Sequence, residues 1–172
     1  PLAGPVVAAA VIFNSLKKIP HLNDSKKLSE KQREEIYNFL TNSPDVQWGV
    51  GIVSEKIIDK INILQATKLA MNKAISKLSA DYLLIDGNLK INSIVRQKTV
   101  VKGDAKVFSI AAASIIAKVT RDRLMDKYHK KYPQYGFDKH KGYGTSAHFA
   151  NIEQFGPCKI HRKTFYPVSK FV

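Results

Sequence analysis

The chain has 172 residues, 44% of them hydrophobic, which is enough for one compact domain with its own core, and we expect a single domain over residues 1–172. Lysine and arginine number 28 against 14 acidic residues, and the resulting formal charge of +14 predicts a nucleic-acid partner. The single cysteine, Cys158, excludes an intrachain disulfide and a zinc cluster and is typical of the cytoplasm, and no apolar run approaches the roughly 18 residues of a membrane span.

The first half of the chain alternates between predicted strands and helices. Val6 to Phe13 is an unbroken apolar run, which is typical of a strand buried on both faces. A helix begins at Ser29, whose spacing to Gln32 fits a capping box. We expect its apolar stripe to contain Ile36, Phe39 and Leu40. Residues 47–53 alternate as a strand, in which Trp48 is expected to belong to the core.

The second half continues the alternation. Residues 54–78 are mostly helical, with inward candidates Ile57, Ile58, Ile61, Leu64, Leu69 and Ile75. Short strands are predicted at 82–85 and 98–101, followed by a long helix from Phe108 to about His129, a basic loop over 139–144 and a last helix capped by Thr145 and Gly156. This order predicts an α/β fold with a partly parallel, helix-covered sheet.

Two aspartates follow predicted strands. Asp86 ends a buried strand, and Asp104 lies between another strand and the long helix, so the two carboxylates are expected to meet at one edge of the sheet. Oxygen ligands of this kind suit Mg²⁺ or Mn²⁺. Each residue also has an ordinary explanation, because Asp-Gly is a turn dipeptide and an aspartate before a helix is often a cap.

Basic segments add to the interpretation. Ser25 and Lys26 lie in a loop with the hydroxyl and ammonium groups that hold phosphate oxygens. Lys118 and Arg121 share one face of the long helix, and Tyr143 follows the basic run 139–141, an arrangement that binds nucleic acids by stacking and charge. The alternatives are solvated lysines and a packing tyrosine. The histidines show no ligand spacing, and the sequence has no P-loop.

Nine runs of residues, in family order, resemble the bacterial type 2 ribonuclease H (ribonuclease HII) family and cover essentially the whole chain. They are PLAGPVVAAAV at 1–11, LNDSKKLS at 22–29, NILQAT at 62–67, LIDGN at 84–88, VVKGD at 100–104, AAASIIAKVTRD at 111–122, YPQYGF at 132–137, HKGYGT at 140–145 and HRKTF at 161–165. One run could arise by chance, but the ordered set is very specific.

The resemblance implies a ribonuclease-H-like fold, with a central mixed sheet flanked by helices. It implies hydrolysis of the RNA strand of RNA/DNA hybrids and incision of duplex DNA at embedded ribonucleotides, using Mn²⁺ or Mg²⁺, with two ions expected. Asp86 and Asp104 match two of the family's four catalytic carboxylates. Tyr143 matches a tyrosine that stacks on a sugar at the RNA–DNA junction, and Lys26 matches a substrate-contacting lysine beside Ser25. Lys118 and Arg121 are expected near the nucleic acid.

The sequence departs from the family pattern at its start. The other two carboxylates, an Asp-Glu pair on the first strand, and a Gly-Arg-Gly that touches the ribose 2′-hydroxyl precede the position of Pro1. We expect a polypeptide that begins at Pro1 to bind nucleic acid weakly and cleave negligibly. A non-catalytic nucleic-acid-binding protein is the alternative, and an RNA-only nuclease is disfavoured by Tyr143. We expect a cytoplasmic monomer.

Overall fold

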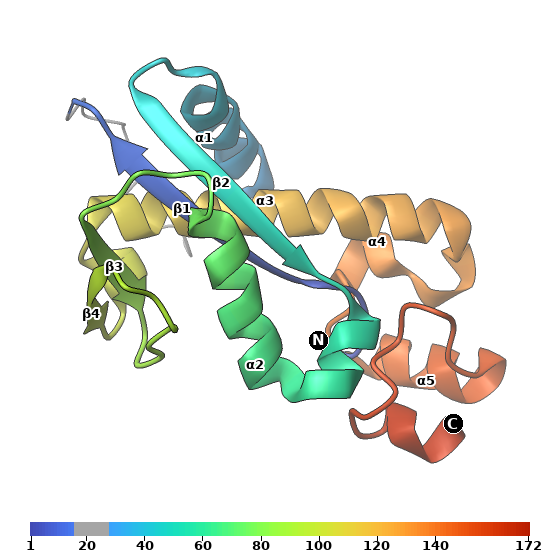
Figure 1. The fold of residues 1–172 in the computed structure, drawn as a ribbon. Helices are drawn as coiled ribbons and strands as arrows, with labels where there is room; N and C mark the ends of the chain where they lie inside the picture. Colours follow the sequence, from blue (N-terminus) through green and yellow to red (C-terminus); the bar gives the residue numbers. More distant parts are fainter. Residues whose placement is uncertain (16–27) are drawn as a thin grey trace. The chain divides into compact units, whose positions relative to one another are not determined.

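The computed structural model describes residues 1–15 and 28–172. The predicted alternation of strands and helices is confirmed (Figure 1). In chain order the elements are β1 (Val6–Phe13), α1 (Glu30–Asn42), β2 (Val46–Val53), α2 (Glu55–Ile75), β3 (Tyr82–Asp86), β4 (Arg96–Val100), α3 (Phe108–Lys131), α4 (Phe137–His140) and α5 (Ser146–Phe155).

The chain folds into two compact units, each described by itself. The strand unit contains residues 7–52 and 67–119, and the helical unit contains residues 1–6, 53–66 and 120–172. That the whole chain forms one domain stays a prediction. Among the described residues, no helix has the length and apolar character needed to cross a membrane.

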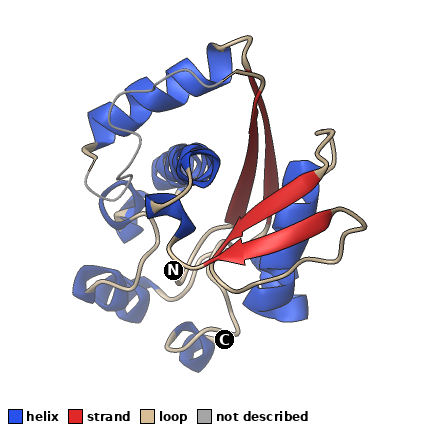
Figure 2. Cartoon of the chain, turned by 90° about the vertical axis from the view of Figure 1, so that its left-hand side faces the viewer, coloured by secondary structure: helices blue, strands red, loops and turns tan. Residues whose placement is uncertain are grey.

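The strands pair two by two in the part of the chain that the structure describes (Figure 2, red). β1 lies beside β2, and their arrows run in opposite directions (Figure 1). β3 and β4 are parallel, with Tyr82 opposite Arg96 and Asp86 opposite Val100. The strand unit therefore contains both directions of pairing, as expected for a partly parallel architecture.

Within the strand unit, α2 packs directly against the backbone of β2. A Cβ atom on Gly49 would lie 2.1 Å from the carbonyl oxygen of Ala74, and one on Gly51 would lie 1.9 Å from that of Ala70. Because contacts that short are impossible, β2 needs glycine at both positions to let the helix approach. The alanines at four-residue spacing present a flat face to the strand.

A hydrophobic core of the strand unit forms where α1 and the first half of α3 pack against β1 and β2. Ile36 and Leu40 of α1 contact the small and branched residues of α3 there. The capping box predicted at the start of α1 is confirmed, with the Ser29 side chain accepting from the Gln32 N–H group and the Gln32 side chain accepting from the Ser29 N–H group. The capping box therefore fixes the start of α1, the helix that contributes Ile36 and Leu40 to this core.

Several burial predictions are wrong. Phe39 is exposed, because it lies beside the stripe of Ile36 and Leu40, which alone are buried in α1. Trp48 is also exposed, with its Nε1 atom 3.4 Å from the Thr41 carbonyl oxygen. Leu64 is 49% exposed, because Asn62, at φ 64°, interrupts α2 and changes the faces of the residues that follow.

The helical unit has two small cores, one around Met125, Tyr135 and Phe137 and one around Leu2, Ile152 and Val168. The prediction for α5 is confirmed at its N-terminus, where the Thr145 hydroxyl accepts from the His148 N–H group. The prediction of a basic loop over residues 139–144 is partly wrong, because Lys139 and His140 belong to α4.

Candidate active site

Asp86 and Asp104 come together at the carboxyl end of the parallel pair β3–β4. Asp86 is the last residue of β3, and its Oδ1 atom accepts a hydrogen bond of 2.7 Å from the N–H group of Gly103, the residue before Asp104. The next amide, that of Gly87, donates to the Val100 carbonyl and keeps the two strand ends in register. Asp86 is exposed and Asp104 is buried. The Asp86 carboxylate is therefore oriented by the Gly103 amide and faces solvent, whereas Asp104, the residue after Gly103, is buried.

Gly103 is required for this arrangement. Lys102 adopts a left-handed conformation at φ 55°, so the chain turns sharply after β4 and directs the Gly103 amide toward β3. A Cβ atom on Gly103 would lie 2.7 Å from Cδ1 of Ile110 and 3.2 Å from Oδ1 of Asp86. Any side chain there would press on both, so the glycine permits the close approach of the Asp86 carboxylate.

A cavity of about 340 Å³ adjoins this end of the strand unit. Its lining includes Asp86 and comes mainly from apolar residues of β1, β3 and α3, among them Val7–Ile12, Leu83–Ile85, Ile110, Ala113 and Ala117. Phosphate groups are bound chiefly by cations together with hydroxyls and amides, and the lining of this cavity includes hydroxyl-bearing residues such as Thr67 and Ser109 but neither lysine nor arginine. We therefore assign the cavity no role in phosphate binding.

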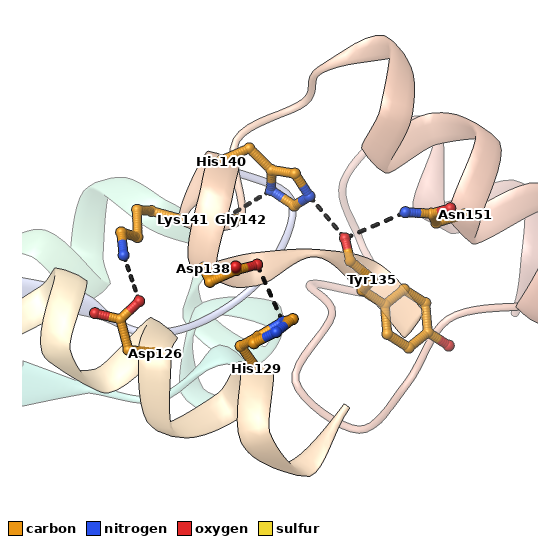
Figure 3. Close-up of polar contacts among 8 residues, drawn as sticks. All are labelled: Asp126, His129, Tyr135, Asp138, His140, Lys141, Gly142 and Asn151. Carbon is orange, nitrogen blue, oxygen red and sulfur yellow. Dashed lines mark hydrogen bonds and ion pairs between the residues drawn. The ribbon is translucent and has the colours of Figure 1, made fainter. Parts of the chain in front are cut away.

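Tyr143 lies in the helical unit, just after α4, and its side chain is 48% exposed. The guanidinium carbon of Arg121 is 5.4 Å from the centroid of its ring, a cation–π distance. The preceding turn is fixed by an ion pair between Lys141 and Asp126 and by bonds of His140 to the Gly142 amide and the Tyr135 carbonyl (Figure 3). Tyr143 is therefore exposed and follows a turn that is held by an ion pair and hydrogen bonds.

Arg121 is buried and uses its donors on backbone carbonyls. Its Nε atom donates to Pro5 at 3.2 Å, Nη2 to Ala3 at 3.2 Å and Nη1 to Lys141 at 2.9 Å. Arg162, also buried, donates to the carbonyls of Gly4 and Pro5, and burial and then the nearby Arg121 lower the pKa of its guanidinium to about 10. Arg121 thereby joins the start of the chain to the turn before Tyr143, and Arg162 adds further bonds to the start of the chain. Contact of Arg121 with nucleic acid stays a prediction.

The remaining residues predicted to bind nucleic acid are Lys118, Ser25 and Lys26. Lys118 is partly buried on α3. Ser25 and Lys26 lie outside the described residues. Within residues 1–15 and 28–172, no three His, Cys, Asp or Glu side chains are grouped so that they could hold a metal ion. Asp86 and Asp104 are thus two carboxylates of the right chemical type, in the strand unit, without a third such ligand from the described chain.

The whole-chain comparison decides the family. The sequence model of the family described as Ribonuclease HII matches residues 1–168. The chain belongs to the ribonuclease HII family. The resemblance inferred from the nine sequence runs is confirmed, and ribonuclease HII membership makes the chain a ribonuclease H-type hydrolase.

Individual ribonucleases HII agree with this assignment. That of Chlamydia caviae is 56% identical over 174 residues, which cover 100% of this chain and 82% of that protein. That of Chlamydia muridarum is 55% identical, with 100% and 80% covered. The crystal structure of the ribonuclease H2 from Pyrococcus horikoshii OT3 matches with a TM-score of 0.77 at 27% identity, covering 99% of this chain and 91% of that one. The ribonuclease-H-like fold is therefore confirmed.

Sequence reasoning missed one polar cluster of this ribonuclease HII chain. His148 and His161 are buried in the helical unit, and their Nε2 atoms are 3.0 Å apart. Burial lowers the pKa of each ring to about 4. The only signal in the sequence was compositional, because three of the five histidines fall between residues 140 and 161.

Proposed function

We propose that the chain provides the catalytic domain of a nuclease that hydrolyses the RNA strand of RNA/DNA hybrids and incises duplex DNA at embedded ribonucleotides. Membership of the ribonuclease HII family supports the reaction class. The observation that supports the proposal is the bond from the Gly103 amide to Asp86, which puts Asp86 beside the residue that precedes Asp104. A passive binding protein would gain nothing from two acidic residues so near each other beside nucleic acid.

The proposed cofactor is Mg²⁺ or Mn²⁺, with two ions expected. Asp86 and Asp104 would hold it, and their donor atoms fit, because hard divalent cations take oxygen ligands and Mg²⁺ is often bound by one or two carboxylates together with substrate phosphates. When bound, such ions supply water activation and neutralise the charge of the phosphoryl group. The exposure of Asp86 leaves its carboxylate accessible to a cation from solvent.

The remaining residues would bind and orient the substrate. Water attacks the phosphorus in line, the bond to the 3′-oxygen breaks, and that oxygen takes a proton, which leaves a 5′-phosphate and a 3′-hydroxyl. The exposed ring of Tyr143 would stack on a sugar at the RNA–DNA junction. Ser25, Lys26, Lys118 and Arg121 are proposed to lie along the nucleic acid, and recognition of the 2′-hydroxyl would distinguish RNA from DNA.

The decisive experiment replaces Asp86 by asparagine in the full-length enzyme and measures cleavage of duplex DNA with one ribonucleotide in Mn²⁺ and in Mg²⁺. Asparagine keeps an oxygen for the Gly103 amide, so the fold should survive while the negative charge is lost. We expect a loss of about 100-fold or more in kcat. The matched control is Asp81→Asn, an exposed aspartate just before β3.

Two outcomes would count against the proposal. Undiminished cleavage by Asp86→Asn would remove Asp86 from the reaction. Binding of the duplex by the unaltered protein without any cleavage would favour the non-catalytic nucleic-acid-binding protein instead. Salt dependence of binding cannot separate the two, because both would neutralise phosphates with the same lysines.

A further inference from the structure

Three histidine rings, those of His140, His148 and His161, lie together next to the turn that carries Tyr143. The rings of His140 and His148 are stacked, with centroids 4.4 Å apart and planes at 17°. His148 and His161 are 0% and 1% exposed, and their Nε2 atoms are 3.0 Å apart. The rings of Phe137 and Tyr135 pack around the pair. Two imidazoles are therefore held in contact with each other in a largely aromatic environment.

The backbone groups at the ends of this pair fix where its protons lie. The Cys158 N–H group can only donate, and it lies 2.9 Å from Nδ1 of His161, so that nitrogen accepts and the His161 proton is on Nε2. The Tyr143 carbonyl can only accept, and it lies 2.9 Å from Nδ1 of His148, so that nitrogen carries the His148 proton. The two Nε2 atoms then form one donor–acceptor pair, and every ring nitrogen is satisfied.

The Tyr143 backbone is held at both of its polar groups. Its N–H group donates to the His140 carbonyl at 2.8 Å, and its carbonyl accepts from His148 and from the Thr145 N–H group at 2.9 Å. His140 in turn accepts from the Gly142 amide and donates to the Tyr135 carbonyl (Figure 3). Because both peptide groups are fixed, the direction in which the exposed ring leaves the backbone is fixed as well.

We propose that His161 and His148 are positioning residues for Tyr143, forming a relay from the Cys158 amide through two neutral imidazoles to the Tyr143 carbonyl. This proposal rests on the proposed function, in which the Tyr143 ring contacts the sugar at the junction. The relay holds the tyrosine so that its ring meets the sugar in one orientation. Neither histidine touches the substrate, so each acts only through Tyr143.

Two nearly isosteric substitutions separate the relay from simple packing. In His148→Asn the side-chain amide nitrogen takes the place of Nδ1 and can still donate to the Tyr143 carbonyl. In His148→Gln the amide reaches the place of Nε2, so it can meet His161 but loses the bond to Tyr143. For the full-length enzyme on duplex DNA with one ribonucleotide, we expect His148→Gln to lower kcat/KM about 5-fold. His148→Asn should retain most of the activity.

A double-mutant cycle tests whether the effect passes through the tyrosine. When Tyr143 is already replaced by alanine, His148→Gln should change kcat/KM by less than a factor of 2, because the group it positions is gone. If His148→Gln costs the same factor in both backgrounds, or if the Asn and Gln variants are equally impaired, the histidine has only a packing role and the proposal fails.

A spectroscopic measurement on the unaltered enzyme needs neither a variant nor activity. Ring ¹⁵N chemical shifts at pH 7 should show the proton on Nδ1 of His148 and on Nε2 of His161, with a scalar coupling between the two Nε2 atoms. A doubly protonated ring or the opposite tautomers would overturn the relay. If the unaltered enzyme cuts no substrate, the proposed function fails by itself, and the same cycle measured as Kd for the duplex decides the role of the histidines.

Discussion

Acidification should destabilise the protein through His148 and His161. Burial lowers the pKa of each ring from 6.5 to about 4. Between these values the unfolded chain binds protons that the folded chain excludes, so the free energy of unfolding falls as pH drops from 6.5 to 4 and is unaffected by these rings at higher pH. At pH 5 the two pKa values give a loss of about 2 kcal/mol for each ring, or about 4 kcal/mol for both. This is a large part of the 5–15 kcal/mol that typically stabilises a domain.

Urea unfolding followed by circular dichroism at pH 7, 6, 5 and 4.5 measures this loss. Carboxylates also titrate in the range, so the reference is the double variant His148→Asn, His161→Asn, which keeps every carboxylate and lacks both imidazoles. The unaltered protein should lose about 4 kcal/mol more than the double variant between pH 7 and pH 5. Parallel curves for the two proteins would show that burial of these rings does not exclude protons, and the reasoning would be refuted.

Two further predictions concern close backbone approaches. Gly51→Ala should lower the free energy of unfolding by about 3 kcal/mol in urea titrations, because its Cβ atom would overlap the Ala70 carbonyl. Gly87→Ala, with open space but φ +78°, is the control and should lose only about 1 kcal/mol; equal losses would contradict the steric argument. Gly103→Ala should reduce cleavage more than duplex binding, because its Cβ atom would press on the Asp86 carboxylate; a parallel fall in both would place the damage elsewhere.

The features that could be predicted correctly from the sequence depend on residues that lie close together along the chain. The capping box of Ser29 and Gln32 spans three residues, as does the bond from the His148 amide to the Thr145 hydroxyl. The proximity of Asp86 to the residue before Asp104 also follows from a local rule, since Asp86 ends one strand of a parallel pair and Asp104 follows the other. Capping and strand-end rules need no knowledge of distant parts of the chain.

The errors arise where a distant contact or a backbone break decides. The prediction that Leu64 points inward assumes one continuous helix, which Asn62 interrupts. The hydrogen bonds of Arg121 could not be predicted either, because two of its acceptors, the carbonyls of Ala3 and Pro5, are more than 100 residues away in the sequence; its contact with nucleic acid stays a prediction. His148 and His161 are 13 residues apart on different segments, and no periodicity relates them. Such pairs are specified only by the tertiary fold.

The bond from the Gly103 amide to the Asp86 carboxylate also has an entropic consequence. An unrestrained aspartate samples several rotamers, and restricting it to one costs up to about 1 kcal/mol. In this chain the main chain imposes that restriction when the strand unit folds, before any ligand arrives. If Asp86 holds a cation as proposed, that cation finds one carboxylate oxygen already directed by the backbone. The affinity of Asp86 for the cation should then depend on how rigid the turn at residues 101–105 is rather than on the freedom of the side chain.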